Sequence, residues 1–402
     1  MSVTERLSVS FYVFLIGRAV FSAIDAIVVT SIAWHLYEST KDPFDLALVG
    51  LFQIAPIYLF FVLTGWVVDH VSRKRILQIG AVVQLAVLIM VALLMQSGDF
   101  NKWYLLGLIA GLGSVKAFLS PALQAILPNL VTKSQLSSAI ALTSTVWNVS
   151  LTGGPFIAGL LIALLNFKIY WVIVALALIT SVCFFWLPPI KAANTMKRSA
   201  SDLWRGFSFL RDNRIVLGSL LLDLLIVLGG SVVALLPIYA SDILKIGPEG
   251  LGLLRSMPAI GAVLVGIYLT RYKTEFENTG RTLFTALSVF SLSVILFALT
   301  DNVWLSCTCL FIYGASDMFS VVIRGAAIHH NTPDELRGRV SALNSIFIAS
   351  SNQLGDFRAG SVAAVAGPVN AALIGGVTSV AVVVWGYSRF TNLRKLKSSR
   401  VE

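Results

Sequence analysis

The 402-residue chain carries little charge: only 12% of its residues are Asp, Glu, Lys or Arg, whereas 57% are apolar or aromatic. Soluble domains are roughly a quarter charged, so a soluble protein of this size is excluded. The mean hydropathy of +0.84 indicates instead that lipid surrounds most of the chain. Because one membrane-spanning helix needs about 20 apolar residues, the chain has room for roughly a dozen spans and for no sizeable soluble domain.

Cysteine and histidine are also scarce. Three cysteines, all within apolar stretches, exclude a disulfide framework: Cys183, Cys307 and Cys309. Four histidines have no carboxylate or cysteine at metal-ligand spacing: His35, His70, His329 and His330. No nucleophile, base and orienting group recur together in any span or loop. We therefore expect no metal site, no cofactor and no enzyme activity.

Apolar runs bounded by charged or turn residues predict twelve membrane-spanning helices. The first six cover residues 10–36, 46–68, 76–96, 103–127, 137–165 and 169–187. The second six cover residues 215–239, 250–270, 282–300, 303–327, 338–365 and 369–387. The predicted fold class is an all-α polytopic membrane protein. Its expected parts are an N-terminal six-helix half, a cytoplasmic linker, a C-terminal six-helix half and a basic cytoplasmic tail: 1–187, 188–214, 215–387 and 388–402.

Positive charge in the loops predicts the orientation. If both termini are cytoplasmic, the outer loops hold only Lys41, Lys102, Lys168 and Lys245, and every other loop Lys or Arg is cytoplasmic. The positive-inside rule selects this topology. The net charge of +10 is spread over many loops, so it indicates contact with anionic membrane lipids and no nucleic-acid partner.

The linker contains apolar residues at helical spacing among arginines: Leu203, Trp204, Phe207 and Leu210. This pattern predicts a short amphipathic helix at the cytoplasmic membrane surface.

An internal repeat relates the two halves. Sliding the chain by 201 residues superposes Gly65 on Gly266 and Gly113 on Gly314, and eight further identities fall within residues 141–159. A common register through spans two, four and five indicates two homologous halves. Parallel halves around a site at the membrane midplane are a transporter architecture.

The loop after the second span has a glycine, an aspartate four residues later and then a basic cluster: Gly65, Asp69, Arg73, Lys74 and Arg75. This pattern resembles the loop signature of the major facilitator superfamily. We expect Gly65 to allow close helix approach and Asp69 to form a gating contact with Arg73 or with a helix N-terminus. The alternative is turn chemistry combined with positive-inside anchoring.

Two further segments support this resemblance, which covers the whole chain. Gly154, Pro155 and Gly159 in the fifth span are similar to the Gly–Pro signature of the antiporter branch. We expect Gly154 and Pro155 to bend this helix and tighten its packing. The loop at 331–339 looks like that of bacterial exporters related to the enterobactin and macrolide efflux members.

Nine charged residues fall within the predicted spans, where an unpaired charge costs at least about 2.5 kcal/mol, so each is a functional-site candidate. The resemblance implies that spans one, four, seven and ten line the central cavity. Six of the nine lie on these spans and are the candidates for substrate or proton binding: Arg18, Asp25, Lys116, Asp223, Asp317 and Arg324. The other three are assigned to an outer gate: Arg255, Asp356 and Arg358. For Arg255, which lies close to the outer end of its span, snorkelling to the membrane interface is the alternative.

The spacing of these charges suggests how they act. Arg18 and Asp25 are seven residues apart, about 10.5 Å along one helix, so we expect their partners to come from across the cavity. Lys116 corresponds to Asp317 under the repeat, and an ion pair there is an alternative to substrate or proton binding. Asp25 and Asp317 are the first candidates for proton coupling and Asp223 is the third. The three cations on the cavity spans favour an anionic solute.

The sequence therefore predicts a secondary active transporter, a monomer in the bacterial inner membrane, that exports a small organic solute by proton antiport. The resemblance suggests a siderophore or a drug-like compound. Proton-coupled uptake of an organic anion or nutrient on the same fold is the alternative. A membrane receptor or scaffold without transport activity is a further rival, although such proteins usually carry a soluble domain.

Overall fold

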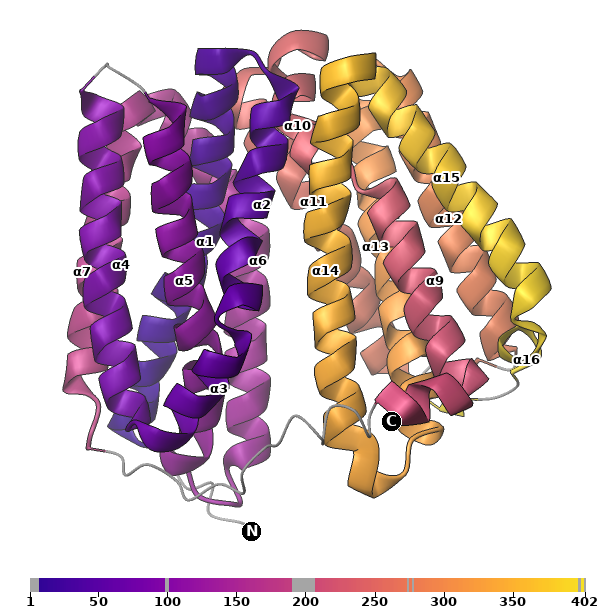
Figure 1. The fold of residues 1–402 in the computed structure, drawn as a ribbon, viewed down its shortest axis with the longest axis horizontal. Helices are drawn as coiled ribbons and strands as arrows, with labels where there is room; N and C mark the ends of the chain where they lie inside the picture. Colours follow the sequence, from indigo (N-terminus) through magenta and orange to yellow (C-terminus); the bar gives the residue numbers. More distant parts are fainter. Residues whose placement is uncertain are drawn as a thin grey trace. The chain divides into compact units, whose positions relative to one another are not determined.

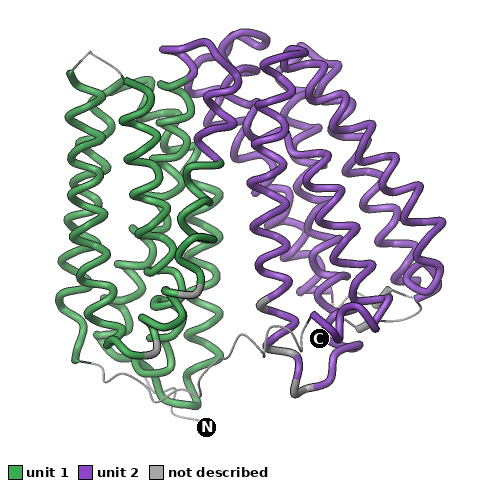
Figure 2. The backbone as a smooth tube through the Cα atoms, viewed as in Figure 1, with its two compact units in different colours: residues 1–36, 51–197 green, residues 37–50, 198–402 purple. Residues whose placement is uncertain are grey.

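The computed structural model describes residues 7–97, 101–189, 207–272, 275–276, 278–396 and 399–400. The chain forms two compact units (Figure 2). Unit 1 comprises Met1–Leu36 and Leu51–Lys197, and unit 2 comprises Tyr37–Gly50 and Arg198–Glu402. Both units consist almost entirely of long helices (Figure 1).

The helices of the first half occupy all six predicted spans. They are α1 (Val9–Thr40), α2 (Pro43–Leu59), α3 (Phe61–His70), α4 (Arg73–Gln96), α5 (Lys102–Ile126), η1 (Leu127–Asn129), α6 (Leu136–Leu165), η2 (Asn166–Lys168) and α7 (Ile169–Trp186). The second predicted span is interrupted at Phe60, where α2 ends and α3 begins. The interruption follows Pro56 by one turn, and proline removes a backbone donor from the helix.

The helices of the second half occupy the other six predicted spans. They are α9 (Arg214–Gly230), η3 (Val233–Leu235), α10 (Leu236–Ile238), η4 (Tyr239–Ile243), α11 (Gly247–Tyr272), α12 (Thr279–Leu299), α13 (Val303–His330), α14 (Asp334–Ala366), α15 (Pro368–Arg389) and α16 (Thr391–Arg394). Two short strands, β1 (Glu275–Phe276) and β2 (Ser399–Arg400), pair antiparallel.

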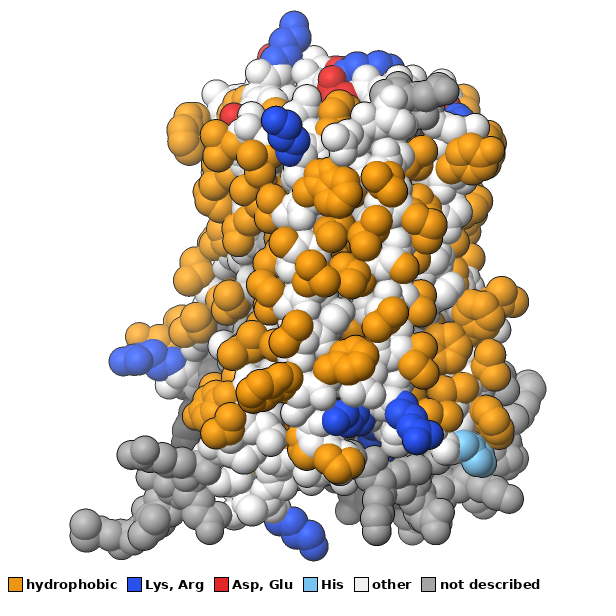
Figure 3. All heavy atoms as spheres, turned by 90° about the vertical axis from the view of Figure 1, so that its left-hand side faces the viewer, with side chains coloured by type: hydrophobic (Ala, Val, Ile, Leu, Met, Phe, Trp, Pro, Cys, Tyr) orange, Lys and Arg blue, Asp and Glu red, His pale blue; other side chains and the backbone are white. Residues whose placement is uncertain are grey.

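The lengths and composition of these helices suit a membrane. Among the described residues, nine helical segments are long and apolar enough to span one, and Leu136–Trp186 contains both α6 and α7. The interrupted α2–α3 and the more polar α14 occupy the two remaining predicted spans. Figure 3 shows apolar side chains covering the middle of one face, with Lys and Arg toward its two ends. The exposed apolar residues of α4 and α7 include Ile79, Val82, Leu178 and Val182.

Residues 37–50 belong to unit 2, although they precede most of the first half in sequence. Here α2 packs on α14: a Cβ on Gly360 would lie 2.9 Å from the backbone oxygen of Pro43 and from the Cβ of Ala47. The rings of Phe44 and Phe357 are 6.3 Å apart. The compact units therefore differ at this segment from the predicted division at residue 188.

The linker is described only from residue 207. Residues 207–212 are helical, and Leu203 and Trp204 lie outside the described residues. Leu210 is buried in a cluster with Val216 and Leu220. This apolar side chain therefore packs inside unit 2. Our expectation that Leu210 faces the membrane surface was wrong.

The internal repeat is visible in the helix packing. In unit 1, α4 contacts α5 and α7; in unit 2, the equivalent α12 contacts α13 and α15. Helix starts repeat as well. Asn101 caps α5 by accepting a hydrogen bond from the N–H of Trp103 (2.9 Å), and Asn302 caps α13 through Trp304 (3.0 Å). These two pairs are 201 residues apart, so the offset read from the sequence also relates the local structures.

The glycine of the fifth span makes the same contact in each half. A Cβ on Gly154 would lie 2.5 Å from the Cβ of Ala26 on α1. A Cβ on Gly355 would lie 3.0 Å from the backbone oxygen of Val227 on α9, which is the 201-residue equivalent of Ala26. Both positions therefore require glycine for close helix packing, as we expected for Gly154.

We expect Gly154→Ala to destabilise the protein by about 1–2 kcal/mol, because the added methyl overlaps Ala26 and overpacking typically costs 1–3 kcal/mol. Gly153→Ala is the matched control, since no atom lies within 4 Å of its added Cβ. This control should be neutral or stabilising, because alanine is the better helix former. Thermal unfolding of the purified variants in detergent measures the difference, and equal midpoints would contradict the packing argument.

Candidate functional site

The charged residues within the spans divide between the two units. Unit 1 holds Arg18 and Asp25 on α1 and Lys116 on α5. Unit 2 holds the other six, on four helices: Asp223 on α9, Arg255 on α11, Asp317 and Arg324 on α13, and Asp356 and Arg358 on α14.

Asp25 and Lys116 form an ion pair within unit 1. The Lys116 Nζ lies 2.7 Å from the Asp25 Oδ2 and donates a hydrogen bond to it. Both side chains keep about a third of their surface exposed, 34% for Lys116 and 32% for Asp25. The pair therefore connects α1 and α5, the first and fourth predicted spans, and both of its side chains stay accessible.

Arg18 lies at the same helix interface as this pair. Its Nη1 donates a long hydrogen bond of 3.5 Å to the backbone oxygen of Leu123 on α5, and its buried Nε has no hydrogen-bond partner among the described residues. Arg18 precedes Asp25 by seven residues, and Leu123 follows Lys116 by seven. Because α1 and α5 run antiparallel, the two contacts form successive levels, about 10.5 Å apart along the helices.

Unit 2 has an ion pair between the equivalent helices. Arg324 on α13 bonds to Asp223 on α9, and both side chains are almost fully buried, at 3% and 6% exposure. We expected the partner of Asp25 to come from across the cavity. This was wrong, because Asp25 pairs with Lys116 on α5 of its own unit. Arg324 likewise pairs with Asp223 on α9 within unit 2.

Asp317 differs from the other carboxylates of the spans. It is half-buried on α13, and among the described residues it has no hydrogen bond and no ion pair. Tyr313, one turn earlier on the same helix, is close enough to interact with it electrostatically. Asp317 is thus a carboxylate in a membrane-spanning helix without a cation partner.

Arg255, Asp356 and Arg358 have local partners in unit 2. The Ser231 hydroxyl donates a 2.5 Å hydrogen bond to Asp356, and Arg255 lies close enough to Asp356 for a Coulomb interaction. Arg358 donates to the backbone oxygens of Leu228 (3.0 Å) and Ser231 (3.2 Å). These carbonyls lie where α9 ends, so the guanidinium satisfies acceptors that the helix end leaves open. Their role in an outer gate stays a prediction.

The loop signature is only partly described. Gly65 lies in α3, and no atom of the described residues lies within 4 Å of the position of a Cβ there. The close helix approach that we expected at Gly65 stays a prediction. The side chain of Asp69 lies outside the described residues. Arg73 is buried and donates a 3.2 Å hydrogen bond from Nη1 to Asn129, whereas Lys74 is half-buried and Arg75 is exposed. Arg73 therefore links the start of α4 to η1, which directly follows α5.

The antiporter-like residues lie inside α6, where Pro155 and Gly159 are buried beside Gly154. In the exporter-like loop at 331–339, the side chains of Asp334, Glu335 and Arg337 lie outside the described residues.

Sequence reasoning missed a polar cluster formed in unit 2 by the end of α1 and the π-helix η4. The Lys41 Nζ lies 2.7 Å from Glu38, 3.0 Å from Ser241 and 3.4 Å from Asp242, and Tyr37 donates a hydrogen bond to Asp242. Partial burial lowers the pKa of Lys41, but the neighbouring carboxylates outweigh this effect and raise it overall. The internal repeat relates positions 201 residues apart but does not predict that they are in contact, so nothing in the sequence indicates this cluster.

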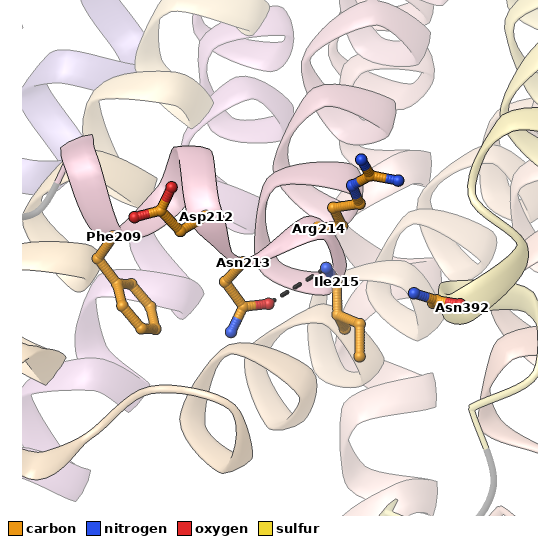
Figure 4. Close-up of a pocket in the computed structure, with 6 residues that line it drawn as sticks. All are labelled: Phe209, Asp212, Asn213, Arg214, Ile215 and Asn392. Atoms are coloured by element: carbon orange, nitrogen blue, oxygen red, sulfur yellow. Dashed lines mark hydrogen bonds between the residues drawn. The ribbon is translucent and has the colours of Figure 1, made fainter.

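A pocket of about 450 Å³ lies at the start of α9 (Figure 4). It is lined by Phe209, Asp212, Asn213, Arg214, Ile215 and Asn392. Asn213 caps the helix by accepting a 3.2 Å hydrogen bond from the N–H of Ile215, drawn in Figure 4. Asp223 lies nine residues beyond Arg214, the first residue of α9, which is about 13 Å along the helix. The pocket therefore lies apart from the charged residues of the spans.

The chain is similar to known transporters along almost its whole length. A family model described as a transmembrane secretion effector matches residues 10–401. Macrolide efflux protein A of Streptococcus pyogenes is 25% identical over 359 residues, which cover 86% of this chain and 87% of that protein. The staphyloferrin A transporter of Staphylococcus aureus is 23% identical over 320 residues, or 77% and 79% of the two chains.

Solved structures confirm the predicted fold. The crystal structure of the nucleoside transporter NupG aligns with a TM-score of 0.73 at 15% identity, covering 97% of this chain and 100% of that one.

Proposed function

Because the chain belongs to the transmembrane secretion effector family, within the major facilitator superfamily, we propose that it exports a small organic solute in exchange for protons. It is a multi-pass membrane transporter and not an enzyme, and the predicted fold of two pseudo-symmetric six-helix halves is confirmed. Direction, substrate and coupling ion are the parts of this function that we propose.

Export is supported by the family and by relatives. The family description names secretion, and one relative named for macrolide efflux aligns over most of both chains. The substrate class that follows is a siderophore or a drug-like compound of similar size. We place the protein in the bacterial inner membrane as a monomer with both termini in the cytoplasm, because this orientation satisfies the positive-inside rule.

Proton coupling rests on one observation: in the described part of the chain, Asp317 has no hydrogen bond and no ion pair. Asp25 and Asp223 each pair with a cation, and Asp356 lies beside Arg255 and accepts from Ser231. An ionised carboxylate is costly within a membrane, and protonation removes that cost where no cation does so. Asp317 is therefore our choice as the residue that takes up a proton on one side and releases it on the other.

The direction of transport can be tested in membrane vesicles of opposite orientation. The face that is periplasmic in the cell is made acidic: the lumen of inverted vesicles and the outside of right-side-out vesicles. An exporter then moves solute into inverted vesicles and not into right-side-out vesicles. A macrolide and staphyloferrin A serve as probes, and vesicles without the protein are the control. Accumulation of a probe only in right-side-out vesicles would overturn export and support the uptake alternative.

A further inference from the structure

The interface between α1 and α5 carries more positive than negative charge. In the described residues of unit 1, two cations and one carboxylate lie on these helices away from the helix ends: Arg18, Lys116 and Asp25. Asp25 pairs with Lys116. The positive charge of Arg18 is therefore not balanced by a carboxylate within its level of the interface.

Arg18 is also short of hydrogen-bond acceptors. A guanidinium has five N–H donors, yet within the described part of the chain Arg18 has only the 3.5 Å contact to the Leu123 oxygen, and its buried Nε has no partner there. An unsatisfied buried donor is unfavourable, more so for a charged group. An external acceptor at this level would remove the deficit.

The second cation is held by an exchangeable partner. Lys116 and Asp25 are each about a third exposed, so another anion can approach the ammonium. The ion pair between the corresponding helices of unit 2, Arg324 and Asp223, is almost fully buried and offers no such access. Each half thus has an ion pair between its first and fourth spans, but the two pairs occupy different positions of the repeat and differ in accessibility.

We propose that the α1–α5 face of unit 1 binds the anionic group of the transported solute. Arg18 takes a carboxylate through two parallel N–H···O hydrogen bonds, a geometry for which the guanidinium is well suited. Lys116 is a second cation, two helical turns along the same face, which becomes available when Asp25 releases it. The identification of the ligand as the transported solute rests on the proposed function, whereas the anion site itself does not.

The test compares carboxylates with their neutral analogues. Thermal unfolding of the full chain in detergent is followed with benzoate, succinate and citrate, and with benzamide, succinamide and triethyl citrate at the same ionic strength. At least one carboxylate should raise the unfolding temperature while its neutral analogue does not. In Arg18→Gln the apparent affinity should fall about tenfold, the usual effect of losing a charge-assisted hydrogen bond, and Arg18→Lys should restore part of it.

A second variant separates binding from folding. Asp25→Asn frees Lys116 from its competitor, so it should strengthen carboxylate binding several-fold; a purely structural pair would give the opposite result. Lys168→Gln is the control. It removes a cation of unit 1 that lies in η2, between two spans, and it should leave carboxylate binding unchanged.

The proposal is overturned if no carboxylate stabilises the wild-type chain in preference to its neutral analogue, or if Asp25→Asn weakens binding. These measurements use no proton gradient, so they are independent of coupling. If the chain binds carboxylates but shows no proton-driven transport, the proposed function is wrong and the anion site stands. If it transports with protons but binds no carboxylate, only the anion site is wrong.

Discussion

Asp317→Asn is expected to reduce transport driven by a proton gradient to the level of protein-free liposomes, while the variant still binds solute within about twofold of wild type. Asparagine has nearly the same shape as aspartate but does not exchange a proton. Asp317 has neither hydrogen bond nor ion pair in the described part of the chain, so neutralising it removes no structural contact. Flux of a labelled probe into proteoliposomes, with and without a pH gradient, measures the effect.

Asp301→Asn is the matched control, because Asp301 is an exposed aspartate just before the start of the same helix, α13. It should transport as wild type does. If Asp317→Asn keeps a pH-dependent flux and Asp25→Asn loses it, the coupling residue is Asp25, the other candidate that the sequence predicted.

Arg324→Leu is expected to destabilise the protein by about 3–5 kcal/mol, because it leaves the Asp223 carboxylate buried without its partner. The pair lies between α9 and α13, with 3% and 6% of the two side chains exposed. The double variant Asp223→Leu with Arg324→Leu removes both charges, and it should recover most of the lost stability because apolar side chains of similar size can replace a buried pair. Thermal unfolding midpoints in detergent measure all three proteins.

Lys116→Leu is the matched control for this experiment. Its pair with Asp25 is about a third exposed, and accessible ion pairs typically contribute about 1 kcal/mol or less. The loss should therefore be clearly smaller than for Arg324→Leu. A double variant no more stable than Arg324→Leu alone would show that the region depends on the arginine side chain itself and not on charge balance.

The positions of the helices could be predicted from the sequence because hydropathy depends on composition over about 20 residues. The repeat could be predicted too, and the equivalent contacts of Gly154 with Ala26 and Gly355 with Val227 show why it is retained. Helix ends extended further than predicted: α13 continues to His330, three residues past the expected end of that span. Local interruptions such as that at Phe60 were missed, because a short break does not change the average hydropathy.

The partners of the charged residues could not be predicted. Whether Lys116 meets Asp25 or Asp317 depends on which faces of two helices pack together, and spacing along one helix does not determine this. The match between Ser231 and Asp356 depends on the end of α9, which the apolar sequence does not mark. The contact of Arg73 with Asn129 required the relative position of α4 and η1. Candidate residues thus followed from burial cost, but their roles required the packing.

The most direct test of the account is to follow protons and solute together. Proteoliposomes containing the protein and a trapped pH-sensitive dye are given a macrolide or staphyloferrin A on one side, with no imposed pH gradient. Entry of solute should drive protons out, which the dye reports as a rise in internal pH, and Asp317→Asn should abolish this change. Solute entry without any pH change in the wild-type protein, or with protons moving in the same direction, would contradict proton-coupled export.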